Sequence, residues 1–538
     1  MKKFKYTILG LIVASMTLTS CDHYLDINEN PNNIHAEAIT PTLLFPGAVA
    51  QTYRTQATWM NRFGGLMMNS YAGNSYSFGS PFGNEYTLNV DSSFYPQIWD
   101  GLYRNVSNFV AIEKFDNSTH KYDNYLAAAK VMKAFYMQTI VDLYGDAPYS
   151  EAFMGQANAT PKYDNDEEIY RSLILGINDA IAIIDNGNAA ALELGSTDIV
   201  FQGDMDNWKR LANTVKLRLL VRMSKVTGSM ATFRDQQLQT LSGADFVESD
   251  VLVNPGYSAA NDDQQNPFFG YYVRNSSNSQ LQNNTLFTAS EHVATCLNGN
   301  PYNMTDNVYQ KFNGIIDGRR GRMFSLITYN GLSVVKGVRQ GATPGQPGAP
   351  TDLTTVSRFG NGWIFGAGSP SSNAQLTSVG SAKAGVIMTR SESDFLQAEA
   401  ALRYPSVFSF NGQTKFESGI KASFDYLYAA TGASAAYITA IQSKVGLGWT
   451  GTNDNKIEAI MTQKWLATAG INPTESFIDY NRTGFPITPM ATTSAKPNKP
   501  YRLMYPSSEY VANSANVPQI SNAQCFTKNQ TTPFWNQN

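Results

Sequence analysis

The sequence predicts a mainly α-helical body, a tetratricopeptide-like array of helical hairpins that carries a large irregular, loop-rich region. Three observations support this fold class. Apolar residues recur at spacings of three and four near both ends of the chain, Ala-rich faces such as Ala127-Ala128-Ala129 allow close helix packing, and the middle is dense in Gly, Pro, Asn and Ser. We therefore expect helical parts at about residues 41–245 and 386–485, an irregular region at 246–385 and an irregular C-terminal segment at 486–538.

Residues 1–20 predict a lipoprotein signal peptide. A basic start precedes an apolar run at residues 8–18, which is too short to span a bilayer. Leu18-Thr19-Ser20-Cys21 matches a lipobox, in which the Cys thiol is acylated and the Cys becomes the mature N-terminus. An ordinary signal peptide followed by a chance Cys is the alternative. We expect Cys21 to begin a lipidated tether, residues 21–40, that anchors a single body, residues 41–538, to a membrane.

The first hairpin is expected over residues 122–187. Apolar positions recur at helical spacing between residues 122 and 144, and Gly145 with Pro148 ends this helix. Asp164 and Glu167 resemble a capping box that opens the next helix, which Gly187 ends. Further helices are expected at residues 43–69, 92–114, 205–226, 391–403, 416–430 and 453–469.

The irregular region has aromatic residues between its turn-forming residues. Tyr257, Tyr271 and Trp363 lie among Gly, Asn and Ser, and an earlier loop at residues 71–86 has the same character. Disordered segments avoid aromatic residues, and a long loop inside a compact protein is usually functional or disordered. We therefore expect ordered loops that present a ligand.

The composition favours neutral, hydroxyl-rich ligands. Charged residues make up 15% of the chain, against roughly 25% in a typical soluble domain, while aromatic residues reach 12%. Aromatic faces contact the apolar faces of sugar rings and amides bind sugar hydroxyls; the alternative is that the aromatic residues mostly fill the core. The formal net charge is −3 and becomes −6 without the three lysines of residues 1–20. No basic run is present, which excludes a nucleic-acid surface.

The sequence lacks the motifs of common hydrolases and nucleotide-binding proteins. It has no Gly-x-Ser-x-Gly elbow, no His-Glu-x-x-His zinc pair and no Gly-x-x-x-x-Gly-Lys phosphate loop. The only histidines are His23, His35, His120 and His292, and the first two lie in the tether. A triad or metal site would then rest on two isolated residues, so we expect no catalytic residue, no metal site and no cofactor.

Several acidic residues and the cysteines leave alternatives open. Two-carboxylate glycosidase chemistry needs only Asp or Glu, and Asp262-Asp263 is the obvious pair, although adjacent acids are more typical of a turn. Asp164-x-Asp166-x-Glu168 has the alternation of a calcium loop, but N-capping of a helix explains it better. Cys296 and Cys525 either form a disulfide with each other or remain two buried thiols.

Several short segments are spread over essentially the whole mature chain: residues 25–33 (LDINENPNN), 142–152 (DLYGDAPYSEA), 395–400 (FLQAEA), 463–467 (QKWLA), 475–486 (ESFIDYNRTGFP) and 502–506 (RLMYP). In this order and spacing they resemble the SusD/RagB family of nutrient-binding surface lipoproteins of the Bacteroidetes. Phe477 and Asn481 depart from the family pattern, which often has Trp and Arg there, but both positions look structural.

This resemblance implies a fold, a location and partners. It implies four tetratricopeptide-like units with the irregular middle packed on them, and a SusC-like TonB-dependent barrel transporter beneath the protein in the outer membrane. Asp22, Asp26 and Glu29 resemble the surface-export signal of that phylum, which implies a cell-surface lipoprotein that faces outward. Family members bind oligosaccharides, and some bind oligopeptides. We expect a non-catalytic protein that captures oligosaccharides for import, with an oligopeptide-binding member, a glycoside hydrolase or an adhesin as alternatives.

Three loop regions combine aromatic residues with planar hydrogen-bonding groups: residues 71–86, 257–274 and 359–365. Within them we expect exposed stacking platforms and polar contacts for a sugar, with loop packing as the alternative for each residue. On this basis Trp363→Ala should weaken binding about tenfold or more without unfolding the array. The expected platforms are Tyr76, Phe78, Tyr257 and Trp363, and the expected polar contacts are Asn74, Asn261, Asp262 and Arg274.

Overall fold

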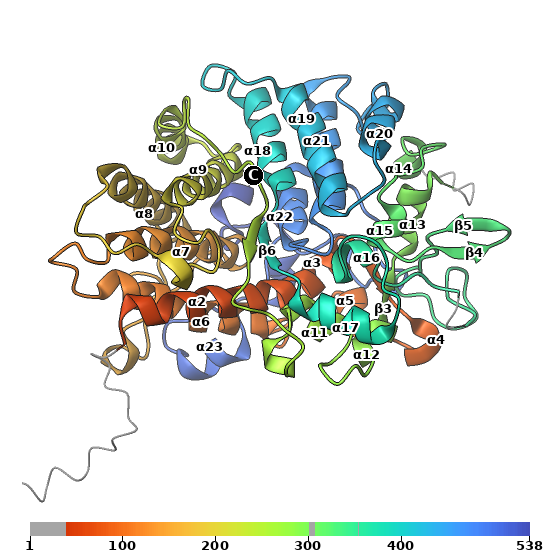
Figure 1. Ribbon diagram of the computed structural model, residues 1–538, viewed down its shortest axis with the longest axis horizontal. Coiled ribbons are helices and arrows are strands. Elements are labelled where there is room, and N and C mark those ends of the chain that lie inside the picture. The colour runs from red at the N-terminus through yellow and green to blue at the C-terminus, as the bar shows by residue number, and fades with distance from the viewer. Residues whose placement is uncertain (1–38, 301–306, 353–354, 538) are drawn as a thin grey trace, which may run out of the picture.

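The computed structural model describes residues 39–300, 307–352 and 355–537, and it is mainly helical, as the sequence predicts (Figure 1). The expected signal peptide, Cys21 and nearly all of the expected tether lie outside the described residues. None of the helices described in these ranges is both long and apolar enough to cross a bilayer.

The first helical part consists of antiparallel helices that pack against their neighbours in the chain (Figure 1). A long helix opens it, in which a short π-helical turn, η3, separates α2 from α3. Residue 145, a glycine in a positive-φ conformation, ends α7, as predicted. The helices are α2 (Pro41–Thr55), η3 (Gln56–Met60), α3 (Asn61–Met67), α6 (Pro96–Lys114), α7 (Asp123–Tyr144), α8 (Asp166–Asn186), α9 (Met205–Arg222) and α10 (Gly228–Gln239).

The capping residue of α8 differs from the prediction. Asn165, not Asp164, caps this helix, because its side chain accepts a hydrogen bond from the backbone N–H of Glu167. Asp164 instead accepts hydrogen bonds from the backbone N–H groups of Tyr149 and Ser150, both at 2.8 Å. It therefore fixes the turn after α7 to the start of α8, and the calcium-loop alternative receives no support from this arrangement.

The second helical part begins with a hairpin of α18 and α19 and continues through α20, α21 and α22 (Figure 1). Helix α18 also contacts α9, and α22 contacts α3, so the two helical parts form one body. Helices α20 and α22 were not predicted. The bounds are α18 (Arg390–Arg403), α19 (Gly412–Tyr426), α20 (Ala433–Ile441), α21 (Asn453–Thr468) and α22 (Thr474–Thr483).

The irregular region is built from short helices and two-stranded ribbons around aromatic side chains of its own. The ribbons pair β1 (Tyr71–Gly73) with β3 (Phe287–Ala289), β2 (Val251–Val253) with β6 (Gly385–Met388) and β4 (Ile327–Tyr329) with β5 (Leu332–Val334), all antiparallel. Its short helices, with those of the preceding loops, are α4 (Ser75–Phe78), α5 (Gly83–Thr87), η4 (Gly155–Ala157), η5 (Gly195–Thr197), η6 (Asp262–Gln264), α11 (Pro267–Tyr272), α12 (Gln282–Leu286), α13 (Glu291–Asn298), α14 (Asn307–Gln310), α15 (Arg320–Met323), α16 (Asn361–Ile364) and α17 (Asn373–Ala382).

The C-terminal segment contains only short helices and wraps back onto the first helical part. The backbone N–H of Phe534 donates to Asp166 at 2.7 Å, and the indole N–H of Trp535 donates to Asp142 at 2.8 Å. Burial raises the pKa of Asp142 to about 6, against the opposing effect of the Arg222 guanidinium. The short helices are α23 (Ser507–Ala512), α24 (Asn522–Cys525) and η7 (Phe534–Asn536).

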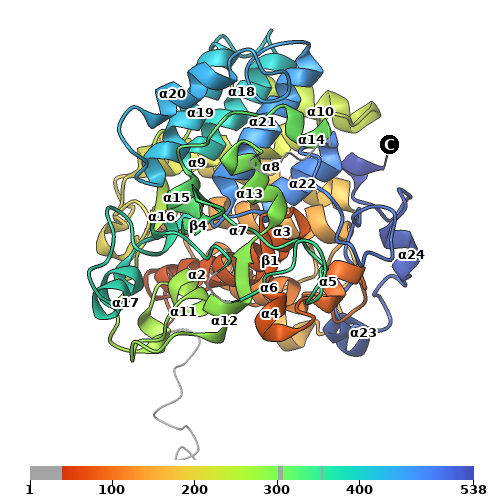
Figure 2. The ribbon, with the colours of Figure 1, turned by 90° about the vertical axis from the view of Figure 1, so that its right-hand side faces the viewer.

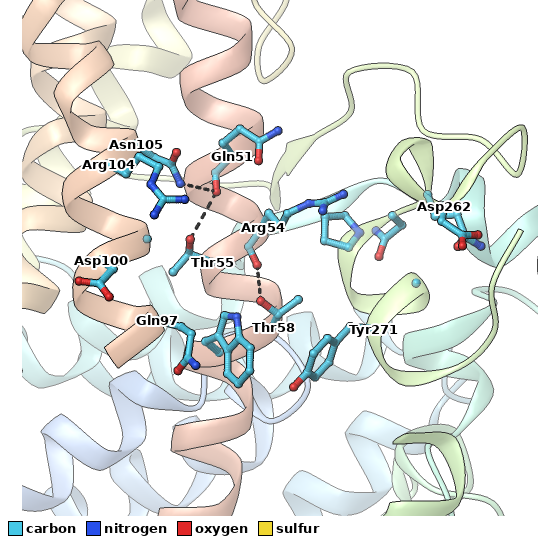
Figure 3. A pocket seen from close by; sticks show the side chains of 16 residues that line it. Gln51, Arg54, Thr55, Thr58, Gln97, Asp100, Arg104, Asn105, Asp262 and Tyr271 are labelled. Carbon is cyan, nitrogen blue, oxygen red and sulfur yellow. Dashed lines mark hydrogen bonds between the residues drawn. The ribbon is translucent and has the colours of Figure 1, made fainter. Parts of the chain in front are cut away.

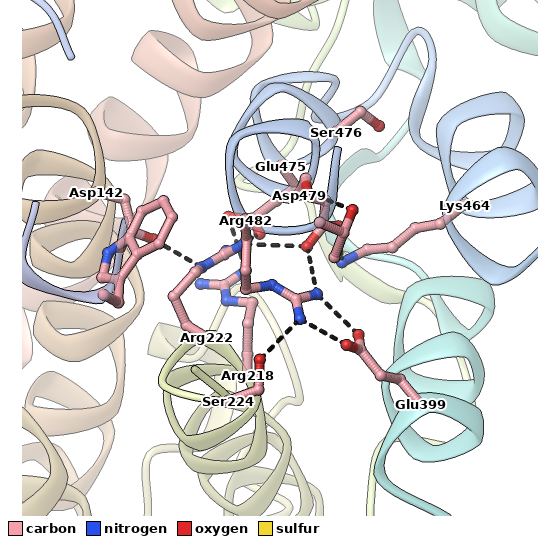
Figure 4. Close-up of polar contacts among 12 residues, drawn as sticks. Asp142, Arg218, Arg222, Ser224, Glu399, Lys464, Glu475, Ser476, Asp479 and Arg482 are labelled. Atoms are coloured by element: carbon pink, nitrogen blue, oxygen red, sulfur yellow. Dashed lines mark hydrogen bonds and ion pairs between the residues drawn. The ribbon is translucent and has the colours of Figure 1, made fainter. Parts of the chain in front are cut away.

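A buried ionic cluster joins the helices that carry the family-like segments (Figure 4). The Arg482 guanidinium pairs with Glu399 at 2.5 Å and with Asp479 at 3.0 Å, and Arg222 of α9 pairs with Glu475 at 2.6 Å. All five side chains are buried. Segments 395–400 and 475–486 therefore meet in the interior, where they hold α18 and α22 against α9.

Lys464, in the matching segment 463–467, completes the cluster. Its ammonium group lies 2.8 Å from Asp479. Although burial alone would raise the pKa of Asp479, the charges of Lys464, Arg482 and Arg222 together lower it well below its usual range. Asp479 is thus ionised at neutral pH. The cluster is a structural element.

Both described cysteines, Cys296 and Cys525, are buried free thiols. Of the two alternatives, the structure therefore supports the buried thiols over the disulfide. Burial raises the pKa of Cys525 to about 11, so this thiol stays protonated at neutral pH. Within the described ranges, no group of three or more His, Cys, Asp or Glu side chains is arranged to hold a metal ion.

Candidate functional site

A cleft of about 740 Å³ opens between the first helical part and the irregular region (Figure 3). One wall is formed by α2 and η3, the second by α6, and the third by the loop that leads from η6 into α11. Its lining mixes amide, hydroxyl, charged and aromatic groups. The lining residues are Gln51, Arg54, Thr55, Thr58, Trp59, Gln97, Asp100, Gly101, Arg104, Asn105, Asp262, Gln265, Asn266, Pro267, Gly270 and Tyr271.

The wall formed by α2 and η3 presents a stripe along one side of the helix. The stripe consists of Gln51, Arg54, Thr55, Thr58 and Trp59, whose spacings of three and four place them on one helical face. The Thr58 hydroxyl donates to the carbonyl of Arg54 at 2.7 Å, within the π-helical turn. Such turns occur often at functional sites because they shift side chains out of the regular α-helical positions.

Helix α6 lies unusually close to α2 at the floor of the cleft. A Cβ atom on Gly101 would lie 2.7 Å from the hydroxyl oxygen of Thr55, which is closer than real Cβ contacts. Glycine is thus required at this crossing of the two helices. The Asn105 amide also donates to the carbonyl of Gln51 at 3.0 Å and fixes the two walls to each other (Figure 3).

Two aromatic side chains meet at the mouth of the cleft. The rings of Trp59 and Tyr271 are 5.7 Å apart at an interplanar angle of 61°, an edge-to-face arrangement, and both are partly exposed. The Arg62 guanidinium lies 5.9 Å from the Trp59 ring, and the Asn283 amide donates to the carbonyl of Tyr271 at 2.9 Å. These contacts hold two amphipathic rings in fixed positions beside polar groups, as recognition of a sugar ring requires.

Some polar groups in the cleft are engaged and others are available. Asp100 accepts a hydrogen bond from the Ser508 hydroxyl at 2.7 Å. By contrast, the side chains of Gln51, Gln97 and Arg104 have no hydrogen bond or ion pair with any described residue and are solvent-exposed. Because amide and guanidinium groups donate hydrogen bonds to hydroxyl and carbonyl oxygens, these three side chains suit a ligand rich in such oxygens.

Of the polar residues predicted from the sequence, Asp262 lines the cleft (Figure 3). It is exposed and accepts hydrogen bonds from the hydroxyl and the backbone N–H of Ser276, at 2.6 and 2.8 Å, which lower its pKa. Asn261 is also exposed, and its side chain accepts from the backbone N–H of Gln264. Asp262 and Asn261 therefore organise the loop, as expected for turn residues.

Tyr257 and Arg274 flank this loop. Tyr257 is half-buried, its hydroxyl oxygen lacks a hydrogen-bond partner among the described residues, and burial raises its pKa. Arg274 donates to the carbonyl of Asn278 at 2.6 Å and fixes its own turn. Neither residue lines the cleft.

The predicted loop at residues 71–86 lies beside the cleft rather than in it. Helix α4 contacts α12, and α12 contacts α11, so the three short helices form a continuous rim (Figure 2). Tyr76 is 51% exposed on this rim and Phe78 is partly exposed. Asn74 is buried at the start of α4, where its amide donates to Ser77.

The predicted exposure of Trp363 is wrong. This side chain is 4% exposed and packs edge to face against Phe324 and Phe359, with ring centroids 5.2 and 5.6 Å away. A Cβ atom on Gly470 would lie only 2.4 Å from the indole. Aromatic residues of the irregular region form its core, because short loops without long helices have few other apolar groups to bury. Because Trp363 is part of this core, we expect Trp363→Ala to lower the stability of the protein.

Trp59, Gln97 and Arg104 were not predicted as site residues. Trp59 lies in a long helix, where a Trp more often belongs to the core. The signal that identifies it is the run Gln51, Arg54, Thr58 and Trp59 at helical spacing, which marks a polar face carrying one exposed aromatic residue.

Comparison with known proteins identifies the family of the chain. A SusD-like family model, described as starch-binding associating with outer membrane, matches residues 31–506. No protein with a curated functional description matches the chain.

Several solved structures share the fold over nearly their whole length. A chitin-binding protein is 23% identical, with a TM-score of 0.68, and the match covers 93% of this chain and 100% of that protein. A chitin-binding SusD homologue from Flavobacterium johnsoniae is 21% identical, with a TM-score of 0.66 and coverages of 91% and 98%. A SusD homologue from Bacteroides thetaiotaomicron is 18% identical, with a TM-score of 0.66 and coverages of 93% and 100%. At these identities the likeness shows the fold.

The family match covers both helical parts, the irregular region and all the segments quoted from the sequence except residues 25–30 of the first. SusD-like proteins bind their ligands without catalysis, which confirms the expectation that this protein is not an enzyme. The family description also confirms the expected location at the outer membrane. The chain belongs to the SusD-like family of non-catalytic, glycan-binding proteins that associate with the outer membrane.

Proposed function

We propose that the protein captures oligosaccharides in the cleft between α2, α6 and α11 and delivers them to a SusC-like TonB-dependent transporter. The observation that carries this proposal is the fixed pair Trp59 and Tyr271, beside the unengaged side chains of Gln51, Gln97 and Arg104. The two rings suit the apolar faces of a sugar, and the three polar side chains suit its hydroxyl and carbonyl oxygens. The cleft volume of about 740 Å³ lies within the usual range for small-ligand sites.

Oligomers of N-acetylglucosamine are the first ligands to test. Two of the similar structures are described as chitin-binding, and the family description names starch. An N-acetyl group carries a carbonyl oxygen that accepts hydrogen bonds, and the cleft offers donors from Gln97 and Arg104. The exposed Tyr76 on the rim extends the surface for an oligomer longer than the cleft.

Calorimetry with chitohexaose, maltohexaose and a mixture of short peptides tests the ligand class. We expect binding to at least one neutral glycan and none to peptides. Trp59→Ala should weaken glycan binding about tenfold, because it removes one of the two rings. Tyr428→Ala, which removes another exposed aromatic residue outside the cleft, is the matched control and should bind as the wild type does.

Other outcomes contradict parts of this proposal. Binding to peptides alone would overturn the glycan assignment in favour of an oligopeptide-binding member of the family. If Trp59→Ala bound the glycan with the affinity of the wild type, the binding site would lie outside the cleft. The expected barrel partner is tested separately: a SusC-like transporter should co-purify in detergent and bury more than the roughly 1,600 Å² of a standard interface.

A further inference from the structure

A second cleft, of about 640 Å³, lies within the helical array, between α8, α9 and the turn that follows α10. Its lining differs in kind from that of the first cleft. Amide and hydroxyl side chains such as Asn178, Asn213, Thr240 and Ser242 alternate with charged residues, and none of the lining residues is aromatic.

Lys216 of α9 forms the base of this second cleft and is 2% exposed. Its ammonium group donates to the side-chain oxygens of Asn178 and Thr240, both at 2.5 Å. Both acceptors are neutral, and Lys216 makes no ion pair with any residue that the structure describes. An ammonium group has three N–H donors, so one remains for a further partner.

The other charges around the second cleft already have partners or lie at its edge. Lys209 pairs with Asp185 at 2.5 Å, and Arg210 donates to the Asn207 side chain at 3.3 Å. Asp206 and Asp245 complete the charged lining. The lining thus has three cationic and three acidic side chains, but the buried cation lacks a countercharge. An uncompensated buried charge is costly, and burial lowers the pKa of Lys216 to about 8.

We propose that this second cleft binds a sugar that carries a carboxylate, a uronic acid, whose carboxylate pairs with the ammonium group of Lys216. The hydroxyl groups of the sugar would then meet Asn213, Thr240 and Ser242. A peptide fits less well, because extended peptides bind at sheet edges and helical ones in apolar grooves, whereas helices and a polar turn line this cleft. The ligand differs in charge from that of the first cleft, so the two sites are independent.

The test compares trigalacturonic acid with its methyl ester, in which each carboxyl group carries a methyl group and no charge, by calorimetry on the wild-type protein. We expect the ester to bind about 10- to 100-fold more weakly, the value of one charge-assisted hydrogen bond. Affinity for the acid should hold between about pH 6 and 7 and fall as the pH rises past about 8, where Lys216 loses its charge. Equal binding of acid and ester, or a flat pH profile, would overturn the proposal.

Variants separate this site from the first cleft. Lys216→Met keeps the unbranched apolar stem of the side chain without its charge and should lose the preference for the acid over the ester. Trp59→Ala should bind trigalacturonic acid as the wild type does, although its neutral-glycan binding is weakened. A folded Lys216→Met that still prefers the acid, or loss of acid binding in Trp59→Ala, would contradict the assignment. If Lys216→Met fails to fold, the comparison of acid with ester and the pH profile, both measured on the wild-type protein, still test whether the second cleft binds a carboxylate. If a peptide with a free C-terminus bound more tightly than trigalacturonic acid, and this binding depended on Lys216, the ligand would be a peptide carboxylate and the uronic-acid assignment would be wrong.

Discussion

The carboxyl group of Asp166 is buried at the start of α8, where it accepts the backbone N–H of Phe534 from the C-terminal segment. Burial, reinforced by the nearby charge of Asp146, raises its pKa to about 7. In an unfolded chain the pKa of Asp is about 3.9. The folded state therefore binds more protons between about pH 4 and 7, so this group lowers the free energy of unfolding as the pH rises through that window.

Asp166→Asn removes this titration while its amide oxygen can still accept the Phe534 N–H. The free energy of unfolding of the variant should fall less than that of the wild type between about pH 5 and 7, as measured by urea denaturation. Asp263→Asn changes an acid whose side chain is 95% exposed and should leave the wild-type pH dependence intact. Parallel pH curves for Asp166→Asn and the wild type would contradict the prediction.

Trp363 shows how an aromatic residue in a loop contributes to stability rather than to binding. Trp363→Ala should lower the free energy of unfolding by about 3–5 kcal/mol, because it empties a site packed by Phe324, Phe359 and Gly470. Tyr76→Ala, which truncates an exposed ring, is the control, and its free energy of unfolding should differ from that of the wild type by less than about 0.5 kcal/mol. Similar stabilities for the two variants would show that the loop core contributes little.

At the scale of elements, the buried ionic cluster links α9, α18, α21 and α22 (Figure 4). Arg482→Met should cost about 3–5 kcal/mol, because Glu399 would stay buried without its main partner and Asp479 would lose one of its three partners. Lys421→Met breaks a solvent-exposed pair with Asp425 and should cost less than about 1 kcal/mol. Urea denaturation measures both, and equal effects would contradict a structural role for the cluster.

The long helices were predictable because the spacing of their apolar residues and the residues that end them are local features of the sequence. Helix α7 ends at Gly145 and α8 at Gly187, as expected, and the predicted residues 453–469 correspond to α21 (Asn453–Thr468). Helix α10 was missed because it buries only Met230 and Leu238, too few apolar residues for a clear period. The predicted single helix at residues 43–69 contains a π-helical turn that no spacing rule reveals.

The candidate site was less predictable than the helices, because burial in the irregular region depends on contacts between distant segments. Asp262 lies in a loop that lines the cleft, whereas Trp363 in a similar sequence context belongs to the core. Trp59 becomes part of a site only because Tyr271, more than 200 residues later, packs against it. Such pairing is a tertiary property and leaves no local signal.

At the scale of the whole molecule, the ionic cluster and the first cleft lie in different layers. The cluster is buried where α9, α18 and α22 meet, while the first cleft opens between α2, α6 and the irregular region. The scaffold is therefore fixed by buried charges, whereas the proposed ligand contacts lie on loops and on one helical stripe. This separation explains why the segments that identify the family carry no information on the ligand.

The proposed anchor concerns the attachment of the whole molecule to a membrane, which no described helix is long and apolar enough to cross. Lipidation of Cys21 should supply the membrane affinity, since several acyl chains together anchor stably whereas one binds only marginally. Cys21→Ala should therefore abolish incorporation of labelled palmitate and release the protein from outer-membrane fractions. Cys296→Ala, which truncates a buried thiol in the body, is the control and should remain lipidated and membrane-bound. If Cys21→Ala still fractionates with outer membranes and stays accessible to external protease in cells that lack the barrel partner, the anchor lies elsewhere in the chain.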